Sequence, residues 1–465
     1  MSIPQQSNGR RSDESANGSQ PEYTGRSIVV LEPGAHPDEE SMVRTLRSFA
    51  GTSSIASSSD FAHHAMVIDQ VGDADAALFP HLGLAVVPGD ADRVATLQNM
   101  ASSEGRVRSV EPEQVMHALS APADATTGVA ADQPLEYLRG YHDAASALFT
   151  NLEQRRSAGA DALSAALLLP SDAPTTVAGT FVDTDTLTWG LQATRVDASR
   201  WTGEGIRLAV LDTGIDLRHP DVVGRRVFNE TFIPGETVQD GNGHGTHTSG
   251  TAAGPRTPPT GSRRYGVAGS VSLYVGKVLS NAGSGSDSQV LAGMDWAIAQ
   301  GCQIISMSLG SDDETISPAY EAAGQSALNA GCLIIAAAGN NARRQLGDFG
   351  FVGRPANSPS IMAVGAVDAG MAIAPFSART GQAAGGQVDI AGPGVAVYSA
   401  WPLPTKYRSI AGTSMATPHV AGIAALVCQA TGATGLALWG ELVRGARQLG
   451  LPSVDIGAGL VQAPQ

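Results

Sequence analysis

A serine, a histidine and an aspartate occur in this chain within segments that suit nucleophilic catalysis. Asp212 lies in VLDTGID, His244 opens HGTHTSG, and Ser414 lies in GTSMATPHVAG. A serine hydroxyl is a weak nucleophile at neutral pH: it needs a base to accept its proton, and the base needs an acid to orient it. Ser414, His244 and Asp212 fit these three roles, so the pattern predicts acyl transfer through an Asp-His-Ser triad.

A fourth segment, AAAGN (336–340), offers a way to stabilise an oxyanion. Its last residue, Asn340, carries an amide that can donate beside the backbone N–H of Ser414. Each residue alone has a simpler interpretation, because Asp212 can cap a turn, Ser414 a helix, and Asn340 can occupy a left-handed turn. HGTH also looks like a metal site, but zinc motifs of the HExxH kind need a four-residue spacing and a glutamate, which this segment lacks.

Together, in the chain order Asp, His, Ser, these segments resemble the subtilisin-like serine proteases. The resemblance covers residues 185–465 and extends, with fewer motifs, to residues 27–119. It implies a serine endopeptidase that is made as a self-processing zymogen. Two other functions stay open: a peptide ligase or transamidase that uses the same triad, and an inactive relative that serves as a binding module.

The resemblance also implies where a substrate binds. GSG (283–285) and SMSLG (306–310) resemble the family segments that flank the substrate, and extended peptides bind by adding to exposed strand edges. Small residues farther along the chain would line a pocket for a large apolar side chain before the scissile bond. Asp287 stands at the position of a lid over a more distant pocket. The substrate-binding residues are expected to be Gly283, Ser284, Gly285, Ser308, Leu309, Gly310, Ala337, Ala338, Gly339 and Gly353.

The N-terminal quarter predicts a small α+β domain. Apolar runs at 27–34, 83–89 and 107–115 predict strands, and the segments 38–51 and 91–102 predict helices. This pattern resembles the inhibitory propeptide domain of subtilisins. SVEPEQVMHAL (109–119) resembles the segment by which such propeptides reach the active site. We therefore expect the chain to cut itself between Leu119 and Ser120, with its own propeptide as a partner.

Continuous apolar strands alternate with helices in the C-terminal part, as in a parallel sheet that is buried on both faces. The predicted fold class is α/β, with a doubly wound, mostly parallel sheet covered by helices on both faces and preceded by the α+β domain. Strands are expected at 206–212, 272–279, 302–309, 332–338 and 360–367, and helices near 287–300, 318–330, 413–429 and 435–447. The expected parts are a disordered tail (1–25), a propeptide-like domain (26–119), a linker (120–184) with an amphipathic helix at 134–159, and a catalytic domain (185–465).

Charge and composition narrow the partners and the location. The net charge of -15 argues against a nucleic-acid partner, and no apolar run is long enough to suggest a membrane partner. Cys302, Cys332 and Cys428 lie in apolar contexts, which favours buried side chains over a disulfide framework. The first residues lack the apolar core of a signal peptide, so the default expectation is a cytoplasmic protein, with export by another route left open.

Calcium is the usual cofactor of the family that the chain resembles. Asp221, in HPD (219–221), stands at a family ligand position. The second ligand loop should be GPRTPPTGSRRYG (254–266), which contains three arginines and no acid or asparagine. Calcium takes about 6–8 oxygen ligands, so this loop does not suit it. We therefore expect no metal ion and no cofactor.

Overall fold

The computed structural model describes residues 21–32, 34–35, 38–71, 74–89, 94–95, 97–99, 101, 105–119, 121, 180–382 and 385–465. The described residues before 120 and from Phe181 onward belong to one compact unit. The predicted helix at 134–159, Ser120 and most of the predicted linker lie outside the described residues.

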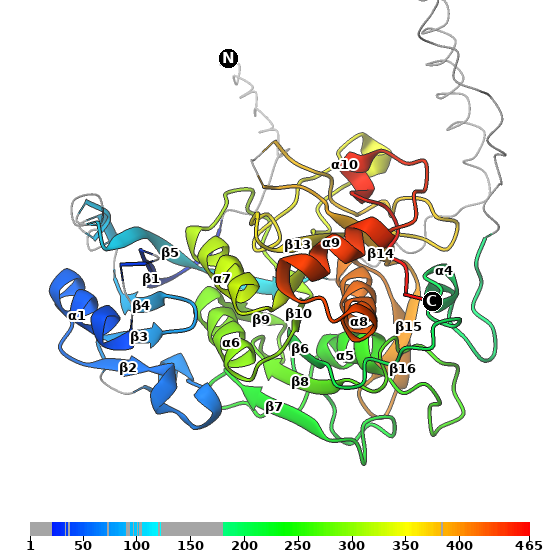
Figure 1. The fold of residues 1–465 in the computed structure, drawn as a ribbon, viewed down its shortest axis with the longest axis horizontal. Coiled ribbons are helices and arrows are strands. Elements are labelled where there is room, and N and C mark those ends of the chain that lie inside the picture. Colours follow the sequence, from blue (N-terminus) through cyan, green and yellow to red (C-terminus); the bar gives the residue numbers. More distant parts are fainter. Residues whose placement is uncertain are drawn as a thin grey trace, which may run out of the picture. The chain divides into compact units, whose positions relative to one another are not determined.

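A parallel sheet forms the centre of the C-terminal part, with strand order β14-β13-β12-β10-β6-β8-β7 (Figure 1). All residues of β10, β12, β13 and β14 are buried, which explains their continuous apolar sequences. The strands are β6 (Arg207–Asp212), β7 (Val227–Thr231), β8 (Ser272–Lys277), β10 (Ile304–Met307), β12 (Leu333–Ala337), β13 (Met362–Val367) and β14 (Ile390–Pro393). Each neighbouring pair is parallel, so the carboxyl ends of these strands lie along one edge.

Two groups of helices cover this sheet. Helix α8 (Thr413–Thr431) packs on β12, β13 and β14 and against α5 (His244–Ala253), whereas α6 (Asp287–Ala299) packs against α7 (Pro318–Asn329) and on β6 and β8. Sequence signals set where α6 and α7 begin: a capping box at Ser286 precedes α6, and Pro318 opens α7 after the cap Ser317. The predicted doubly wound α/β fold is therefore confirmed. Other helices that the structure describes after residue 180 are α4 (Trp189–Ala193), the 3-10 turn η5 (Arg344–Leu346), α9 (Gly435–Gly445) and α10 (Ser453–Ile456).

The N-terminal part forms a second sheet, in which β1 pairs with both β4 and β5 and β3 pairs with β4 and β2. Its elements are β1 (Tyr23–Leu31), α1 (Glu39–Ala50), β2 (Ile55–Ser57), β3 (Ala76–Phe79), β4 (Leu84–Pro88) and β5 (Val107–Ala118), with short 3-10 turns η1 (Ser58–Asp60), η2 (Ala62–His64) and η3 (Ile68–Gln70). Strand β1 begins within the segment 1–25 that the sequence assigns to a tail. The described residues of the expected helix 91–102 that follow 93 are helical.

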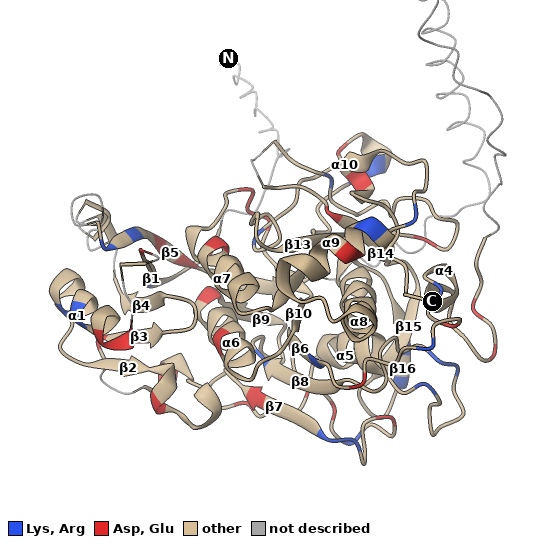
Figure 2. Ribbon diagram, in the orientation of Figure 1, with Lys and Arg blue, Asp and Glu red and all other residues tan. Residues whose placement is uncertain are grey.

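The two faces of β1 bury against different layers. Val29 packs with Leu46 and Phe49 from α1, whereas Ile28 belongs to the core that includes Val290 of α6. Alternation along a strand sends successive side chains to opposite faces, so the N-terminal sheet lies between α1 and the α6–α7 pair. Figure 2 marks acidic residues on β5, α6 and α7, where these layers meet.

Strand β5 links the N-terminal sheet to the C-terminal part. Its last residues pair antiparallel with β9 (Ser284–Ser286) on one side and with β11 (Leu309–Gly310) on the other. The predicted strand 302–309 is thus two strands, β10 in the central sheet and β11 in the second sheet. The end of β5 lies between two edges of the C-terminal part, as an extended peptide would.

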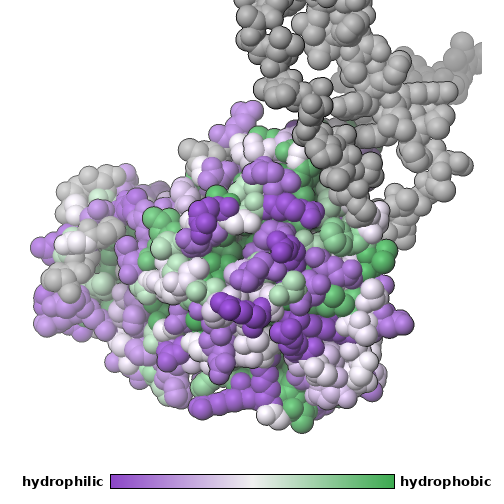
Figure 3. All heavy atoms as spheres, turned by 45° about the vertical axis from the view of Figure 1, so that its right-hand side comes forward, coloured by the Kyte–Doolittle hydropathy of each residue, from purple (hydrophilic) through white to green (hydrophobic). Residues whose placement is uncertain are grey.

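Some elements carried no clear sequence pattern. Strand β7 is half-buried throughout, and β15 (Val397–Trp401) pairs with β16 (Lys406–Ile410), whose residues are mostly exposed. In the face drawn in Figure 3, hydrophilic residues are interspersed with apolar ones. Among the described residues, no single helix passes a length-and-hydropathy test for crossing a membrane; only the pair α8–α9, bent by 105°, passes it. All three cysteines are buried and free.

Candidate active site

Asp212 ends β6 as a fully buried carboxylate with several hydrogen-bond donors. His244 Nδ1 lies 2.8 Å from Asp212 Oδ1, and the Thr213 N–H and the Thr248 hydroxyl donate to the same carboxylate over 2.7 and 3.1 Å. A carboxylate can only accept, so the proton of the neutral His244 ring is on Nδ1. This tautomer leaves Nε2 of His244 with a free lone pair, as a base requires.

His244 is the first residue of α5 and is buried. Burial favours its neutral ring, but the charge of Asp212, the hydrogen bond to it and the charge of Asp240 together raise the pKa of His244 above its ordinary value. Its Nε2 has no hydrogen-bond partner among the residues that the structure describes. Since buried polar atoms are normally paired, this nitrogen is poised to accept a proton from a group that approaches it.

Ser414 lies in the first turn of α8, which follows Gly412. Its side chain does not cap the helix; instead, Oγ donates to the Ser308 carbonyl over 3.1 Å and to the Leu119 carbonyl. The helix N-terminus supplies free N–H groups and a partial positive charge at this point. The Ser414 hydroxyl therefore lies against a peptide carbonyl at a place that favours negative charge.

The Leu119 carbonyl oxygen also accepts a hydrogen bond from Asn340, whose Nδ2 donates over 2.9 Å. The other end of this amide is fixed, because Asn340 Oδ1 accepts from the Thr413 N–H over 2.9 Å and from the Thr413 hydroxyl over 3.0 Å. Gly339, with φ of 126°, makes the turn before Asn340, which itself is not left-handed. The structure thus brings Ser414 and Asn340 to one carbonyl, that of the residue expected at the cut.

The segments expected to flank a substrate hold the end of β5. The Ala118 N–H donates to the Gly283 carbonyl over 2.9 Å, and the Leu119 N–H donates to the Ser308 carbonyl over 3.3 Å. Around these bonds, the paired residues are Met116 with Gly285, His117 with Ser284 and Gly310, and Ala118 with Leu309. All six residues expected at the two edges therefore lie beside residues 116–119.

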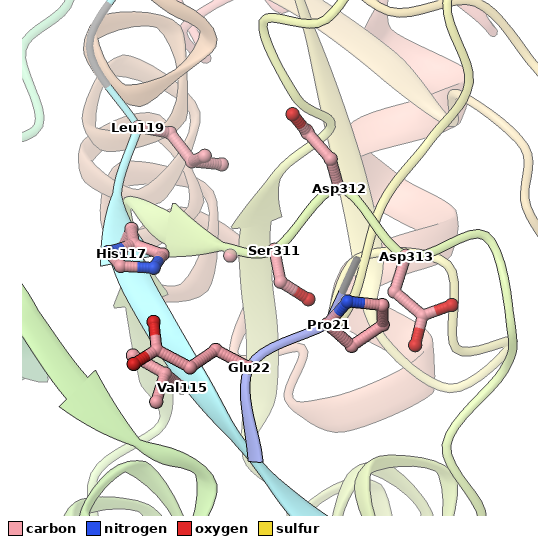
Figure 4. Close-up of a pocket in the computed structure, with 9 residues that line it drawn as sticks. Pro21, Glu22, Val115, His117, Leu119, Ser311, Asp312 and Asp313 are labelled. Atoms are coloured by element: carbon pink, nitrogen blue, oxygen red, sulfur yellow. The ribbon is translucent and has the colours of Figure 1, made fainter. Parts of the chain in front are cut away.

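The residues expected to line a pocket lie near Leu119 or near one another. A Cβ on Gly310 would approach Leu119 Cδ1 to 3.1 Å, and the Gly353 N–H donates to the Ala338 carbonyl over 3.0 Å. Ala337 and Ala338 are buried. Figure 4 shows Val115 and His117 on β5 and Leu119 directly after it. Together with Pro21, Glu22 and residues 310–313, these residues line a cavity of about 180 Å³.

Two arginines near this region differ in their contacts. Arg344 donates to the Ser377 carbonyl over 2.7 Å and pairs with Asp455 over 2.8 Å. Its guanidinium therefore holds its own loop to the C-terminal region of the chain, while Arg343 is exposed. Because these contacts engage its guanidinium, Arg344 is not available to bind an acidic side chain of a substrate.

Asp287, which stands at the position of a lid, is covered by the end of β5. It is fully buried, and its carboxylate accepts from the Gln114 N–H over 2.8 Å and from the Tyr320 hydroxyl over 3.0 Å. Burial raises the pKa of Asp287 to about 7, against the opposing charge of Arg354, whose Nη1 lies 3.5 Å away. The sequence hid this role because an acid in the first turn of a helix is common for electrostatic reasons alone.

Two glutamates of β5 hold the N-termini of the helices beneath it, and sequence reasoning missed both. Glu113 accepts from the Ser288 N–H over 3.0 Å at the start of α6, and Glu111 accepts from the Ala319 N–H over 2.8 Å at the start of α7. Negative side chains are favourable there because helix N-termini carry unpaired N–H groups and positive potential. The spacing Glu-x-Glu in the expected final strand was the available signal.

The other histidines near the triad have structural roles. Burial lowers the pKa of His247 to about 3, and its Nε2 lies 2.9 Å from the Val397 carbonyl. Burial also lowers the pKa of His419, to about 4, and its Nδ1 contacts the Met415 carbonyl at 2.8 Å. Both rings are neutral donors inside the fold, so neither is placed to bind a metal with His244.

The residues around Asp221 do not suit the calcium ion that the family resemblance implies. Asp221 Oδ2 accepts from the hydroxyls of Tyr265 and Tyr407 over 2.6 and 2.9 Å. Asp221 Oδ1 is buried without a partner among the described residues, but Arg225 lines the same cavity, of only about 10 Å³. No group of three or more His, Cys, Asp or Glu side chains that could hold a metal occurs in the described part of the chain.

Two guanidinium groups bind backbone carbonyls where a cation would otherwise be expected. Arg225 donates to the Ala253 carbonyl, and its Nη2 donates to the Val271 carbonyl over 3.0 Å. Arg264 donates to the carbonyls of Gly266 and Val267, each over 3.3 Å. These carbonyls bracket the loop 254–266, so a fixed positive charge already occupies its base.

Comparison with known proteins identifies the family of the C-terminal part. The model of the Subtilase family matches residues 203–448. Subtilisin DY of Bacillus licheniformis is 41% identical over 238 residues, which are 51% of this chain and 81% of that protein. Subtilisin Savinase of Lederbergia lenta is 41% identical over 280 residues, 59% of this chain and 96% of that protein. Subtilisin E of Bacillus subtilis (strain 168) is 41% identical over 239 residues, 51% of this chain and 59% of that protein.

The chain therefore belongs to the subtilase family. It is a serine endopeptidase, and its substrates are proteins or peptides. Subtilisins generally catalyse hydrolysis without a cofactor, although they often bind calcium.

One expectation from the sequence is wrong. The default location was the cytoplasm, whereas the subtilisins that this chain resembles are secreted, extracellular enzymes. The missing signal-peptide pattern was a weak basis for that expectation, because it judged only the first residues of the printed sequence.

Proposed function

We propose that Ser414 is the nucleophile, His244 the general base and Asp212 the residue that orients His244. One observation carries the assignment: the Leu119 carbonyl oxygen accepts from both the Ser414 hydroxyl and the Asn340 amide. In the reacting state Ser414 Oγ turns its proton toward His244 Nε2, the unpaired buried nitrogen. Asp212 keeps the ring in the required tautomer and stabilises the charged ring that forms.

The reaction follows from these contacts. Ser414 Oγ forms a bond to the carbonyl carbon, and His244 takes the hydroxyl proton. The peptide C–N bond then breaks, and His244 gives this proton to the leaving amine. Water, activated by the same His244, cleaves the resulting ester and releases the acid. In the tetrahedral intermediates, Asn340 and the backbone N–H of Ser414 stabilise the negative oxygen.

The first substrate is the chain itself, cut between Leu119 and Ser120. Residues 26–119 are the propeptide, residues 120–184 a linker, and residues 185–465 the catalytic domain. The pairing of residues 115–118 with β9 and β11 supports this proposal, because the Leu119 carbonyl that follows them accepts a hydrogen bond from the Ser414 hydroxyl. After cleavage the propeptide stays bound as an inhibitor, held by Glu111 and Glu113 at two helix N-termini.

Specificity at the cut comes from small residues. Gly283, Ser284, Gly285, Ser308, Leu309 and Gly310 bind the substrate backbone, while Ala337, Ala338, Gly339 and Gly353 leave room for a large apolar side chain. Leu119, which lies beside Gly310, has such a side chain. Peptides with Leu, Met, Phe or Tyr before the scissile bond are therefore preferred over those with Asp or Glu.

Calcium is not needed for folding. Arg225 and Arg264 provide the positive charge at the base of loop 254–266, and the hydroxyls of Tyr265 and Tyr407 satisfy Asp221 Oδ2. A cation beside Arg225 would meet a charge of its own sign in a cavity about the size of one water molecule.

Fluorophosphonate labelling with peptide hydrolysis tests the assignment. Wild-type protein should label at Ser414 and hydrolyse a peptide containing Val115 to Leu119, whereas Ser414→Ala should do neither although it remains folded, as a cooperative thermal unfolding transition would show. Peptidase activity of Ser414→Ala within tenfold of wild type would refute the triad. Products joined to an added amine in preference to water would instead indicate the ligase, which the family relatives do not favour.

A further inference from the structure

Gln114 is held by side chains of the catalytic domain at a point where the strand pairing ends. Residues 115–118 of β5 pair with the backbone of β9 or β11, but Gln114 does not. Its N–H instead donates to Asp287 Oδ2 over 2.8 Å. The residue is only 4% exposed, so its surroundings discriminate among side chains.

The side-chain amide of Gln114 is recognised at both ends by one loop. Nε2 donates to Asp313 Oδ2 over 2.8 Å, and Oε1 accepts from the Ser311 hydroxyl over 3.5 Å. Figure 4 shows Ser311 and Asp313 on the segment that follows β11. A donor faces an acceptor at each end, as recognition of an amide requires.

The carboxylate that binds the Gln114 backbone is itself fixed by the catalytic domain. Asp287 accepts from the Tyr320 hydroxyl over 3.0 Å and lies 3.5 Å from Arg354. Arg354 also lies 3.4 Å from Glu111 and 3.7 Å from Asp313. Of these groups, only Glu111 belongs to the propeptide.

Departure of the propeptide changes the charge of this cluster. Asp287, Asp313 and Arg354 remain, which is two carboxylates against one guanidinium, and the Gln114 amide leaves its partners vacant. A substrate side chain that donates a hydrogen bond restores the contact, whereas a carboxylate meets Asp313 with the same charge.

We propose that Asp287, Asp313 and Ser311 form a subsite that selects a glutamine five residues before the residue at the cut. The proposal rests on the proposed function, because residues 114–119 mark the path of a substrate only if the bond after Leu119 lies at the nucleophile. Asp287 binds the backbone N–H of this glutamine, and Asp313 and Ser311 bind its side-chain amide.

Peptides that cover residues 113–121 of this chain test the subsite, with Gln, Glu or Leu at position 114. The enzyme is the self-processed protein, with free active sites counted by fluorophosphonate titration. We expect kcat/KM for the Gln peptide to exceed that for the Glu peptide by about tenfold, from one hydrogen bond gained and one repulsion avoided. Asp313→Asn should reduce this ratio to about twofold or less, because it removes the repulsion.

A matched control uses the neighbouring acid. Asp312 is exposed and contacts Asn341 over 3.2 Å, so Asp312→Asn makes the same charge change without touching Gln114 and should leave the ratio unchanged. Equal cleavage of the Gln and Glu peptides by wild type, or an unchanged ratio in Asp313→Asn, would overturn the subsite. A shorter peptide that begins at Val115 distinguishes failure of the subsite from failure of the proposed function. If the enzyme cuts this peptide but cleaves the three longer peptides equally well, only the subsite proposal fails. If the enzyme does not cut it, the proposed function and the subsite proposal fail together.

Discussion

Replacing Asn340 by alanine should slow the chemical step far more than it weakens substrate binding. Asn340 Nδ2 lies 2.9 Å from the Leu119 oxygen, the distance of a full-strength hydrogen bond, and this oxygen becomes the oxyanion. Loss of such a donor costs about 2.7–4 kcal/mol of barrier, a range known for a subtilisin and carried over here from a relative. At about 1.36 kcal/mol per factor of ten, kcat should fall by about 10²–10³. KM should change little, since the donor acts mainly in the transition state.

Steady-state hydrolysis of a short peptide that ends in Leu before the cut measures this effect. Asn340→Asp is the sharper variant, because its carboxylate still accepts from the Thr413 N–H but can no longer donate. It should lose at least as much kcat as Asn340→Ala. Asn341→Ala is the control, since the Asn341 amide donates to the Phe351 carbonyl over 3.0 Å and not to Leu119. An effect confined to KM, or near-normal kcat in Asn340→Asp, would refute the oxyanion assignment.

Three further predictions concern pH and metal. In the pH profile of kcat/KM, the midpoint of the acidic limb should lie above the ordinary histidine pKa of 6.5, because Asp212 raises the pKa of His244 and only the neutral ring is a base. The substitution Asp212→Asn should move this midpoint to lower pH. The melting temperature of Ser414→Ala protein, which cannot digest itself, should be the same in excess EDTA and in excess calcium. It should fall when Arg225→Met is added, because Arg225 holds backbone carbonyls at the base of loop 254–266, but not when Arg256→Ala removes an exposed arginine of that loop. Cleaved propeptide should bind more tightly at acidic pH and more weakly as pH rises through the pKa of His81, which the hydrogen bond to Asp295 raises above its ordinary value. The fraction of propeptide that co-elutes with the enzyme in size-exclusion chromatography should fall accordingly, and co-elution that increases with pH would contradict this prediction.

The parts of the fold that the sequence predicted are those with strong local patterns. Apolar runs such as 332–338 are buried on both faces, and Ser286 and Ser317 mark the starts of α6 and α7 as helix caps do. The proposed triad could be identified from the sequence for another reason, since Asp212, His244 and Ser414 each stand in a distinctive segment. Strand β7, half-buried along its whole length, offers neither a continuous nor an alternating pattern and was missed.

What the sequence could not predict depends on partners distant in the chain. In the sequence, Asp287 looks like an ordinary acid in the first turn of a helix. Its contacts with Tyr320 and Gln114 form only in the folded protein. Asp221 likewise looks like a calcium ligand until Tyr407, far along the chain, donates to it. Such contacts follow from the tertiary fold, and a single sequence without its fold carries no local signal for them.

The most direct test of the central claim, that this protease cuts itself after Leu119 with Ser414, is the intact mass and N-terminal sequence of purified protein. Wild-type protein should yield a chain that begins at Ser120 together with the separate propeptide, and Ser414→Ala should remain one uncut chain. Wild-type protein that stays uncut after long incubation, or that begins at an unrelated site, would contradict the account. So would equal processing of pure Ser414→Ala, because the cut would then come from another protease.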